Sequence, residues 1–267
     1  MRVPGRRGFT LPEIMIAMLL TVVLFGFGYA LLNMSSSVFH QVSGHDDGEL
    51  QMKKISRRLQ KDLVASNIDS VRLAPVTDTA GVASDAVSML TMKRDDNANG
   101  EVCTTEAGEP FWQRNIIYYL VRPQGDACAP QADADGYEDA CPHKVAIRKV
   151  VDSGVATEPQ PAGDPVNDSE EALDNLAPYL TRPPADYDVS TMLGEPGVTD
   201  AEVVAINLLS MRITQDPEPD APGEVYIELR AFNEEDARNK IPVGTILLSN
   251  TGKAFTQVLS CFPRNIH

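Results

Sequence analysis

A run of nineteen residues without a charged side chain lies close to the start of the chain, at positions 14–32 (IMIAMLLTVVLFGFGYALL). At about 1.5 Å of rise per residue, a helix of this length measures roughly 28 Å, which is about the thickness of the hydrocarbon core of a bilayer. The preceding segment, MRVPGRRG, carries three arginines and no acid. Because positive charge keeps a flanking segment in the cytoplasm, we expect the run to span a membrane and the rest of the chain to lie beyond it.

The remainder of the chain is strongly acidic. The 267 residues have a net charge of −15 and are 43% hydrophobic, and positions 67–267 alone hold 15 basic and 33 acidic side chains. Binding to a phosphate backbone needs clustered Lys and Arg, so this balance argues against a nucleic-acid partner. The hydrophobic content suffices for one sizeable core with appendages.

One carboxylate, Glu13, stands directly before the apolar run. A carboxylate at the centre of a spanning helix costs roughly 2.5 to 3.5 kcal/mol, so it is rare there without a role. A secretory signal has a shorter apolar region followed by a small-x-small cleavage site, and the stretch NMSSSVFHQ at 33–41 contains no clear one. Arg6 and Arg7 also suit a twin-arginine signal, but neither kind of signal peptide has a use for Glu13.

The segment GRRGFTLPEIMIAMLL at 5–20 resembles the class III signal of type IV prepilins, which the pseudopilins of secretion systems share. The resemblance implies that a membrane peptidase cuts after Gly8 and methylates the new N-terminal residue, Phe9. It also implies that Glu13 neutralises the amine of a neighbouring subunit in a filament, since two charges in hydrocarbon are tolerable chiefly as a pair. Pro12 replaces the aliphatic residue usual in the family, at little cost one turn into a helix.

These features divide the chain into a leader at 1–8, an N-terminal helix at 9–66 and a β-rich head at 67–267. Beyond the apolar run the helix becomes amphipathic, because Met52, Ile55, Leu59 and Leu63 recur at helical spacing. The other faces carry basic residues, which suit either a solvated surface or a docking strip for an acidic neighbouring head. Two glycines within 43–48 predict a kink or local melting there. The basic residues are Lys53, Lys54, Arg57, Arg58 and Lys61.

After residue 67 the hydrophobic period changes from 3.6 to 2, which indicates strands. We expect them at 87–93, 116–122, 145–151, 203–213, 225–232 and 245–248. Strands that follow one long helix without crossover helices predict an α+β fold with an antiparallel sheet, and the resemblance makes it pilin-like. Residues 152–200 hold seven prolines and eleven acids against one basic residue. We interpret them as a long acidic insertion loop on the head, with a short helix at most near 168–171 and no second core.

Four cysteines lie on the side expected outside the cytoplasm, where disulfides persist. Four cysteines allow three connectivities. Cys128 and Cys141 enclose only twelve residues, which favours a local clasp between them, and elimination then pairs Cys103 with Cys261. A zinc site would need CxxC or Cys/His spacing that the chain lacks.

Positions 95–106 (DDNANGEVCTTE) fit the calcium-loop pattern D-x-[DN]-x-[DN]-G-x5-E at each specified position. Calcium takes six to eight hard oxygens, and a glycine at the sixth position permits the sharp turn that brings them together. Against this, the flanks predict strands, and the same residue types are ordinary in hairpin turns. The acidic run DADGYED at 133–139 is a weaker candidate, better explained as a solvated loop. The candidate ligands are Asp95, Asn97, Asn99, Glu101 and Glu106, and calcium is the one candidate cofactor.

No nucleophile, zinc or phosphate-loop motif is present, and the four histidines are scattered, so we expect no enzyme. Looser resemblances point to the W-type minor pilins of type IV pili and to the J-type pseudopilins. They lie at Arg58-Leu59-x-x-Asp62-Leu63-x-x-Ser66, at LTMKRDDNANG, at Tyr118 with Ile147-Arg148-Lys149, and at Pro263-Arg264-Asn265.

The resemblance implies a minor pilin that helps initiate pilus assembly at the base or tip. Such a protein sits in the bacterial inner membrane with its head in the periplasm and then enters the pilus. Its partners are other minor pilins, the major pilin, the prepilin peptidase, the inner-membrane assembly platform and a tip adhesin. The alternatives are a J-type pseudopilin of a type II secretion system and a membrane-anchored, calcium-dependent adhesin.

Overall fold

The computed structural model describes residues 11–78, 81–93, 102–104, 108–125, 132–141, 143–152, 170–215, 223–232 and 254–263. The chain forms two compact units, residues 1–44 and residues 45–267. The long helix α1 (Leu11–Val64) contributes to both. The first unit contains a candidate membrane span, Leu11–Met34, with a mean hydropathy of 2.4 and no side chain buried. An apolar surface of this kind is stable in lipid and not in water.

Helix α1 continues without interruption through Gly44 and Gly48. The local melting expected at 43–48 therefore does not occur. Gly48 is buried, so packing offsets the roughly 1 kcal/mol that a glycine costs in a helix. From Met52 onward the helix presents the expected apolar stripe to the core, since Met52, Ile55, Leu59 and Leu63 are each at most 3% exposed.

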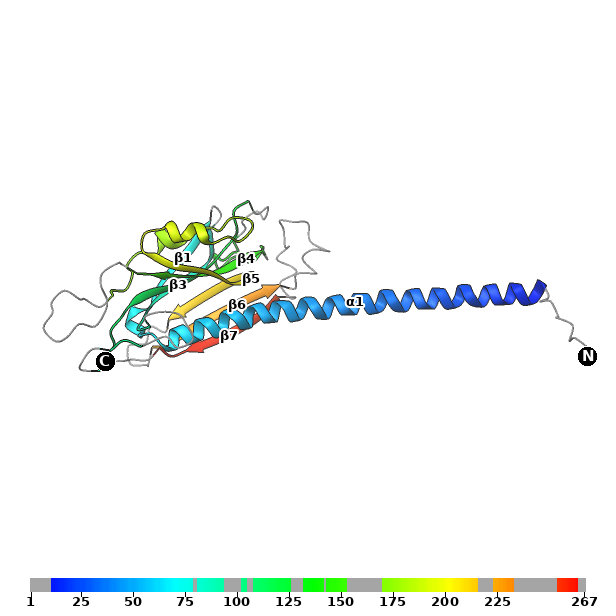
Figure 1. Cartoon of the computed structure of the whole chain (residues 1–267), viewed down its shortest axis with the longest axis horizontal. Coiled ribbons are helices and arrows are strands. Elements are labelled where there is room, and N and C mark those ends of the chain that lie inside the picture. Colours follow the sequence, from blue (N-terminus) through cyan, green and yellow to red (C-terminus); the bar gives the residue numbers. More distant parts are fainter. Residues whose placement is uncertain are drawn as a thin grey trace, which may run out of the picture. The chain divides into compact units, whose positions relative to one another are not determined.

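Within the described residues, the second unit is built on a seven-stranded antiparallel sheet in which each strand pairs with the next along the chain. Figure 1 shows the last turns of α1 running beside β6 and β7. This arrangement confirms the α+β class, because every pairing between neighbouring strands is antiparallel. The strands are β1 (Arg72–Asp78), β2 (Gly81–Thr91), β3 (Arg114–Val121), β4 (Lys144–Val151), β5 (Val198–Gln215), β6 (Val225–Phe232) and β7 (Ala254–Cys261).

Five of the six predicted strands correspond to β2 to β6, and two strands of the structure were not predicted. β1 contains Pro75, which argues against a central strand but is tolerated here because β1 lies at the edge of the sheet. β7 (AFTQVLSC) lacks a long apolar run and lies at the other edge. The predicted strand at 245–248 lies outside the described residues.

The sheet is covered on both faces. On one face, α1 packs on a core that includes Tyr118 and Met211. On the other face, a second apolar cluster joins Tyr119 and Ile147 to Leu176 and Met192 of the 170–198 segment. The two clusters explain why β4 is buried along its whole length. We expected 152–200 to be an insertion loop without a second core of its own. In its described part, from residue 170 onward, Leu176 and Met192 pack on the sheet of the head, because alternate residues of the central strands leave a second apolar face that must be covered.

The covering segment has little regular structure of its own. It contains two short 3-10 helices, η2 (Ala177–Tyr179) and η3 (Ser190–Gly194), which appear in yellow-green above the sheet in Figure 1. The short helix expected near 168–171 does not form at Glu170 and Glu171, the two of those residues that the structure describes.

Candidate functional site

The first candidate site is the face of α1 that carries Glu13, the third residue of the helix. A shallow groove runs along this face and is lined by Glu13, Ile14, Ala17, Met18, Thr21 and Val22. The Thr21 hydroxyl donates to the Ala17 carbonyl (2.7 Å) and is therefore satisfied within the helix. Glu13 is thus the acidic group of a groove whose walls are otherwise apolar. The processing residues Gly8 and Phe9 lie outside the described part of the chain.

The second candidate site is a charged cluster buried between the end of α1 and the sheet, and it centres on Asp62. The Tyr118 hydroxyl donates to Asp62 Oδ2 (2.6 Å), and Arg148 Nε donates to the same oxygen (3.1 Å). Asp62 is 3% exposed and Arg148 is fully buried. Burial raises the pKa of Tyr118 well above its ordinary value, and the Asp62 carboxylate raises it further. Tyr118 therefore acts as a neutral donor, which is what a buried carboxylate needs.

The same cluster reaches the surface through Arg58 on α1 and Glu202 on β5. Arg58 donates to Glu202 Oε1 (3.1 Å), and that oxygen lies 3.6 Å from Arg148 Nη1. The sequence resemblance pointed to four residues of this cluster only as parts of separate motifs. The structure brings the four together at one place: Arg58, Asp62, Tyr118 and Arg148. A buried pair with this many partners fixes how a helix sits on a sheet. Glu202 had no sequence signal, because it lies just before the strand predicted at 203–213, whereas β5 begins at Val198.

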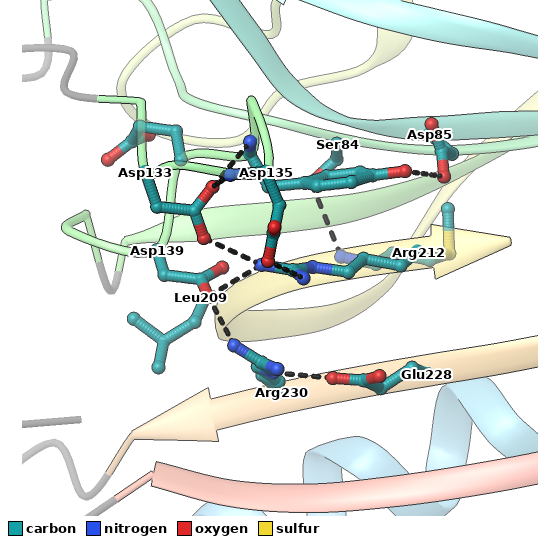
Figure 2. A network of polar contacts seen from close by, with 12 residues as sticks. Ser84, Asp85, Asp133, Asp135, Asp139, Leu209, Arg212, Glu228 and Arg230 are labelled. Atoms are coloured by element: carbon teal, nitrogen blue, oxygen red, sulfur yellow. Dashed lines mark hydrogen bonds and ion pairs between the residues drawn. The ribbon is translucent and has the colours of Figure 1, made fainter. Parts of the chain in front are cut away.

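The acidic loop at 132–141 is fixed to the sheet by arginines of β5 and β6 (Figure 2). Arg212 lies 2.8 Å from Asp133 and 3.2 Å from Asp139, and Arg230 lies 2.6 Å from Asp139. The Arg212 guanidinium also stacks on the ring of Tyr137, 4.3 Å from its centroid. The expectation of a solvated loop was therefore wrong. Asp133 and Asp139 are each already paired with an arginine.

Beneath this loop, two side chains of β2 bind the backbone of β5. The Ser84 hydroxyl accepts from the Met211 N–H (3.3 Å), and Asp85 accepts from the Ile213 N–H (2.8 Å). Tyr137 donates its hydroxyl to Asp85 as well (2.9 Å). Desolvation raises the pKa of Asp85, while the bonds from Ile213 and Tyr137 and the charge of Arg212 oppose that rise. These side chains accept hydrogen bonds from backbone N–H groups of β5 that are not bonded to the backbone of a neighbouring strand.

A second buried cation, Lys149 on β4, holds the covering segment against the sheet. Its Nζ lies 2.6 Å from Glu195 Oε2 and donates to the Thr181 hydroxyl (2.9 Å) and to the Tyr179 carbonyl (2.7 Å). Desolvation lowers the pKa of Lys149, and its bond to Glu195 acts in the opposite direction. The Tyr119 hydroxyl donates to the Thr181 carbonyl (2.9 Å). Lysine at this position thus ties the acidic segment to the sheet.

Lys144 and Glu138 form a further buried pair, with Nζ and Oε2 3.1 Å apart. Lys144 also donates to the carbonyls of Glu138 and Leu209. Lys144 is thus held by two backbone carbonyls and by the charge of Glu138.

For one of the two expected disulfides, Cys103–Cys261, the structure differs from the prediction. Cys261 at the end of β7 is 1% exposed, packs in the core beneath α1 and carries a free thiol. Cys103 is also described, so the structure does not contain the Cys103–Cys261 disulfide expected by elimination. Register explains this, because Cys261 pairs with Val225 and points into the apolar core. Cys141 is buried, and its expected partner Cys128 lies outside the described residues.

The calcium loop cannot be placed, because 94–101 and 105–107 lie outside the described residues. Within the part of the chain that the structure describes, no group of three or more His, Cys, Asp or Glu side chains is arranged to hold a metal ion. The segment after the loop is described at 102–104, where Val102 bridges Lys93 and Thr104 bridges Pro110. The loop therefore connects β-bridged flanks rather than helices.

An apolar N-terminal helix followed by a head built on an antiparallel sheet is consistent with a pilin-like architecture, and Glu13 is the third residue of that helix. Residues 4–29 match the family model described as the prokaryotic N-terminal methylation motif. The match supports a type IV pilin-like protein, anchored in a membrane, whose class III signal implies processing by a prepilin peptidase. The motif is that of a structural family rather than an enzymatic one. No curated protein and no solved structure matches the chain.

Proposed function

We propose that this chain is a minor type IV pilin, a structural subunit that helps initiate pilus assembly and forms part of a base or tip complex. The observation that carries the proposal is Glu13, a carboxylate at the start of an apolar helix, within a matched N-terminal methylation motif. In hydrocarbon this group is tolerable when a cation neutralises it. A methylated Phe9 amine on a neighbouring subunit supplies that cation.

The net charge of the chain supports a role as a minor subunit rather than as the repeating subunit of the fibre. After removal of residues 1–8 the chain carries 20 basic and 38 acidic side chains, a net −18. Copies stacked closely with one another would repel. A head of about 200 residues has an expected radius of gyration of roughly 16 to 17 Å, which spreads this charge over a small volume. Contact with less acidic subunits relieves the repulsion, so the partners proposed are other minor pilins and the major pilin.

The proposal places the protein in the bacterial inner membrane, with its head in the periplasm, before it enters the fibre. The prepilin peptidase, the inner-membrane assembly platform and a tip adhesin complete the set of proposed partners. A J-type pseudopilin of a type II secretion system shares these features. Deleting the gene separates the two, because loss of surface fibres supports the pilin, whereas loss of protein secretion with normal fibres supports the pseudopilin.

Glu13→Ala tests the role of the carboxylate. The variant should remain in the inner membrane, because insertion depends on the apolar run, but surface fibres should be abolished or sharply reduced. Glu49→Ala is the matched control, since Glu49 is also a carboxylate of α1 but lies in the water-exposed part, and it should leave fibre numbers unchanged. Normal fibre numbers in the Glu13→Ala strain, or a rank of most abundant pilin in sheared fibres, would contradict the proposal.

A further inference from the structure

The exposed face of α1 in the second unit carries a narrow stripe of residues. Leu50, Lys54, Arg57, Lys61 and Val64 follow one another at spacings of 4, 3, 4 and 3, which places them on one side of a helix. All five are exposed. The stripe lies opposite the buried face formed by Ile55, Leu59 and Leu63, and at about 1.5 Å per residue it is roughly 21 Å long.

The three cations of this stripe lack an acidic neighbour within the described part of the chain. No carboxylate there lies within 4.0 Å of Lys54, Arg57 or Lys61. The adjacent Lys53, by contrast, pairs with Glu49 at 2.9 Å, and Arg58 pairs with Glu202 at 3.1 Å. In a chain with 38 acids and 23 basic residues, a row of three cations without a carboxylate leaves a local positive surface.

Apolar side chains bracket this positive surface. Leu50 is 49% exposed and Val64 is 36% exposed. A stripe with cations in the middle and apolar groups at both ends suits a partner that offers carboxylates between apolar contacts. Ion pairs alone at an exposed surface contribute little, about 0 to 1 kcal/mol each. Burial of the apolar ends therefore supplies the rest of the binding free energy of a docking contact.

We propose that the stripe Leu50–Lys54–Arg57–Lys61–Val64 is a docking surface for an acidic face of a different pilin-like subunit. Charge complementarity selects that partner. A second copy of this chain is the less favourable occupant, because two heads of the same strong negative charge repel over the rest of their surfaces. The inference rests on the proposed function for the class of its partner, and it adds which surface is used and what chemistry it recognises.

The test places a photo-activated crosslinker, p-benzoylphenylalanine, at position 57 of the full chain in the membranes of the native host. The expected product is an adduct to an acidic peptide of another chain that itself carries an N-terminal methylation motif. The same crosslinker at Leu193 of η3, which is 49% exposed on the opposite side of the sheet, should not give that adduct. An adduct to a second copy of this chain or to lipid, or no adduct at position 57, would overturn the proposal.

Charge-reversal variants, tested by the yield of the crosslinked adduct, provide a second test of the proposal. With the crosslinker at position 57, Lys54→Glu should lower the adduct yield roughly fivefold, the size expected for one exposed ion pair near 1 kcal/mol. Lys53→Glu changes the charge equally on the same helix, but its lysine is already paired with Glu49, so it should change the yield less than twofold. Substitution of a crosslinked partner carboxylate by Lys should restore the Lys54→Glu yield. Equal losses in both variants, or no restoration, would contradict charge recognition.

The outcomes separate this inference from the proposed function. If fibres depend on Glu13 but position 57 forms no adduct to a pilin-like chain, the docking surface is wrong and the proposed function stands. If fibres do not depend on the protein at all, the proposed function is wrong.

Discussion

Tyr118 on β3 donates a hydrogen bond of 2.6 Å to Asp62 near the end of α1, and Arg148 on β4 binds the same carboxylate oxygen. One carboxylate of the helix is thus held by two strands of the sheet. Since Asp62 and Arg148 are both almost fully buried, neither charge can be satisfied by water if the other is removed.

Asp62→Ala should therefore destabilise the protein strongly. Removing one partner of a buried ion pair costs about 3 to 5 kcal/mol, which for a unit of this size corresponds to a fall in melting temperature of roughly 10 °C. Tyr118→Phe removes one hydrogen bond and leaves the ion pair, so it should cost about 1 to 2 kcal/mol. Thermal unfolding of the full chain in detergent, followed by circular dichroism, measures both. Asp174→Ala, at an exposed acid, is the control, and equal melting temperatures for all four proteins would contradict the structure here.

Part of this site could be predicted from the sequence. The stripe that includes Leu59 and Leu63 showed which face of the helix is buried, and Asp62 lies beside that face. The sequence did not show that Tyr118 and Arg148 would meet Asp62, because the contacts span 56 and 86 residues. Such pairings depend on strand register, which the local pattern at Ile117 or Ile147 does not determine.

The covering segment shows the same limit more clearly. Its prolines and acids predicted a loop, and most of it has no regular structure. The sequence did not reveal that Leu176 and Met192 are core residues, because they are isolated apolar residues without a period. Their burial follows from the second apolar face of the sheet and from Lys149, which binds Glu195.

Asp85, which lies on β2 beneath the acidic loop, predicts an unusual pH dependence of stability. Burial raises the pKa of Asp85 in the folded chain, so the folded state binds this proton more tightly than the unfolded state. The contribution of this group is fully present below the unfolded pKa near 3.8 and is lost as the pH rises through the folded pKa. The free energy of unfolding of the wild-type chain minus that of Asp85→Asn should therefore be larger at pH 4 than at pH 7.

The measurement is the difference in free energy of unfolding between the wild-type and Asp85→Asn chains across this pH range. Comparing the two chains removes the acid sensitivity of the many other carboxylates. A difference that does not change with pH, or that changes in the opposite direction, would show that Asp85 is not desolvated as the structure has it.

The cysteines give a prediction about connectivity. Cys128 and Cys141 should be joined in exported protein, and the bond should stabilise the fold by about 3 kcal/mol in the chain-entropy model. Peptide mapping without reductant identifies the pair directly. Detection of Cys128 joined to Cys103, or of either residue of the pair as a thiol, would refute the assignment.

Cys261 should behave differently, as a thiol that reagents do not reach. Burial in the core and a pKa raised by desolvation both lower its reactivity. A maleimide should label it slowly in the native protein and rapidly after unfolding. Rapid labelling of the native protein would contradict its position beneath α1.

Calcium at 95–106 remains a separate prediction. Millimolar calcium should raise the melting temperature of the full chain, since a ligand that binds only the native state stabilises it by mass action. Magnesium should raise it less, because it accepts fewer ligands and gives up water reluctantly. Asp95→Ala should remove the shift, whereas Asp174→Ala should keep it. An unchanged melting curve with calcium, or a full shift in Asp95→Ala, would show that this segment is an ordinary turn and not a calcium site.

The most direct test of the pilin-like assignment is the intact mass of the protein extracted from membranes. Cleavage after Gly8 predicts a chain that begins at Phe9, because Arg6 and Arg7 keep that bond at the cytoplasmic face where the prepilin peptidase acts. Methylation of the new amine adds about 14 Da. A mass equal to residues 9–267 plus one methyl group is the predicted result, and a mature chain that begins beyond residue 30 would contradict the account.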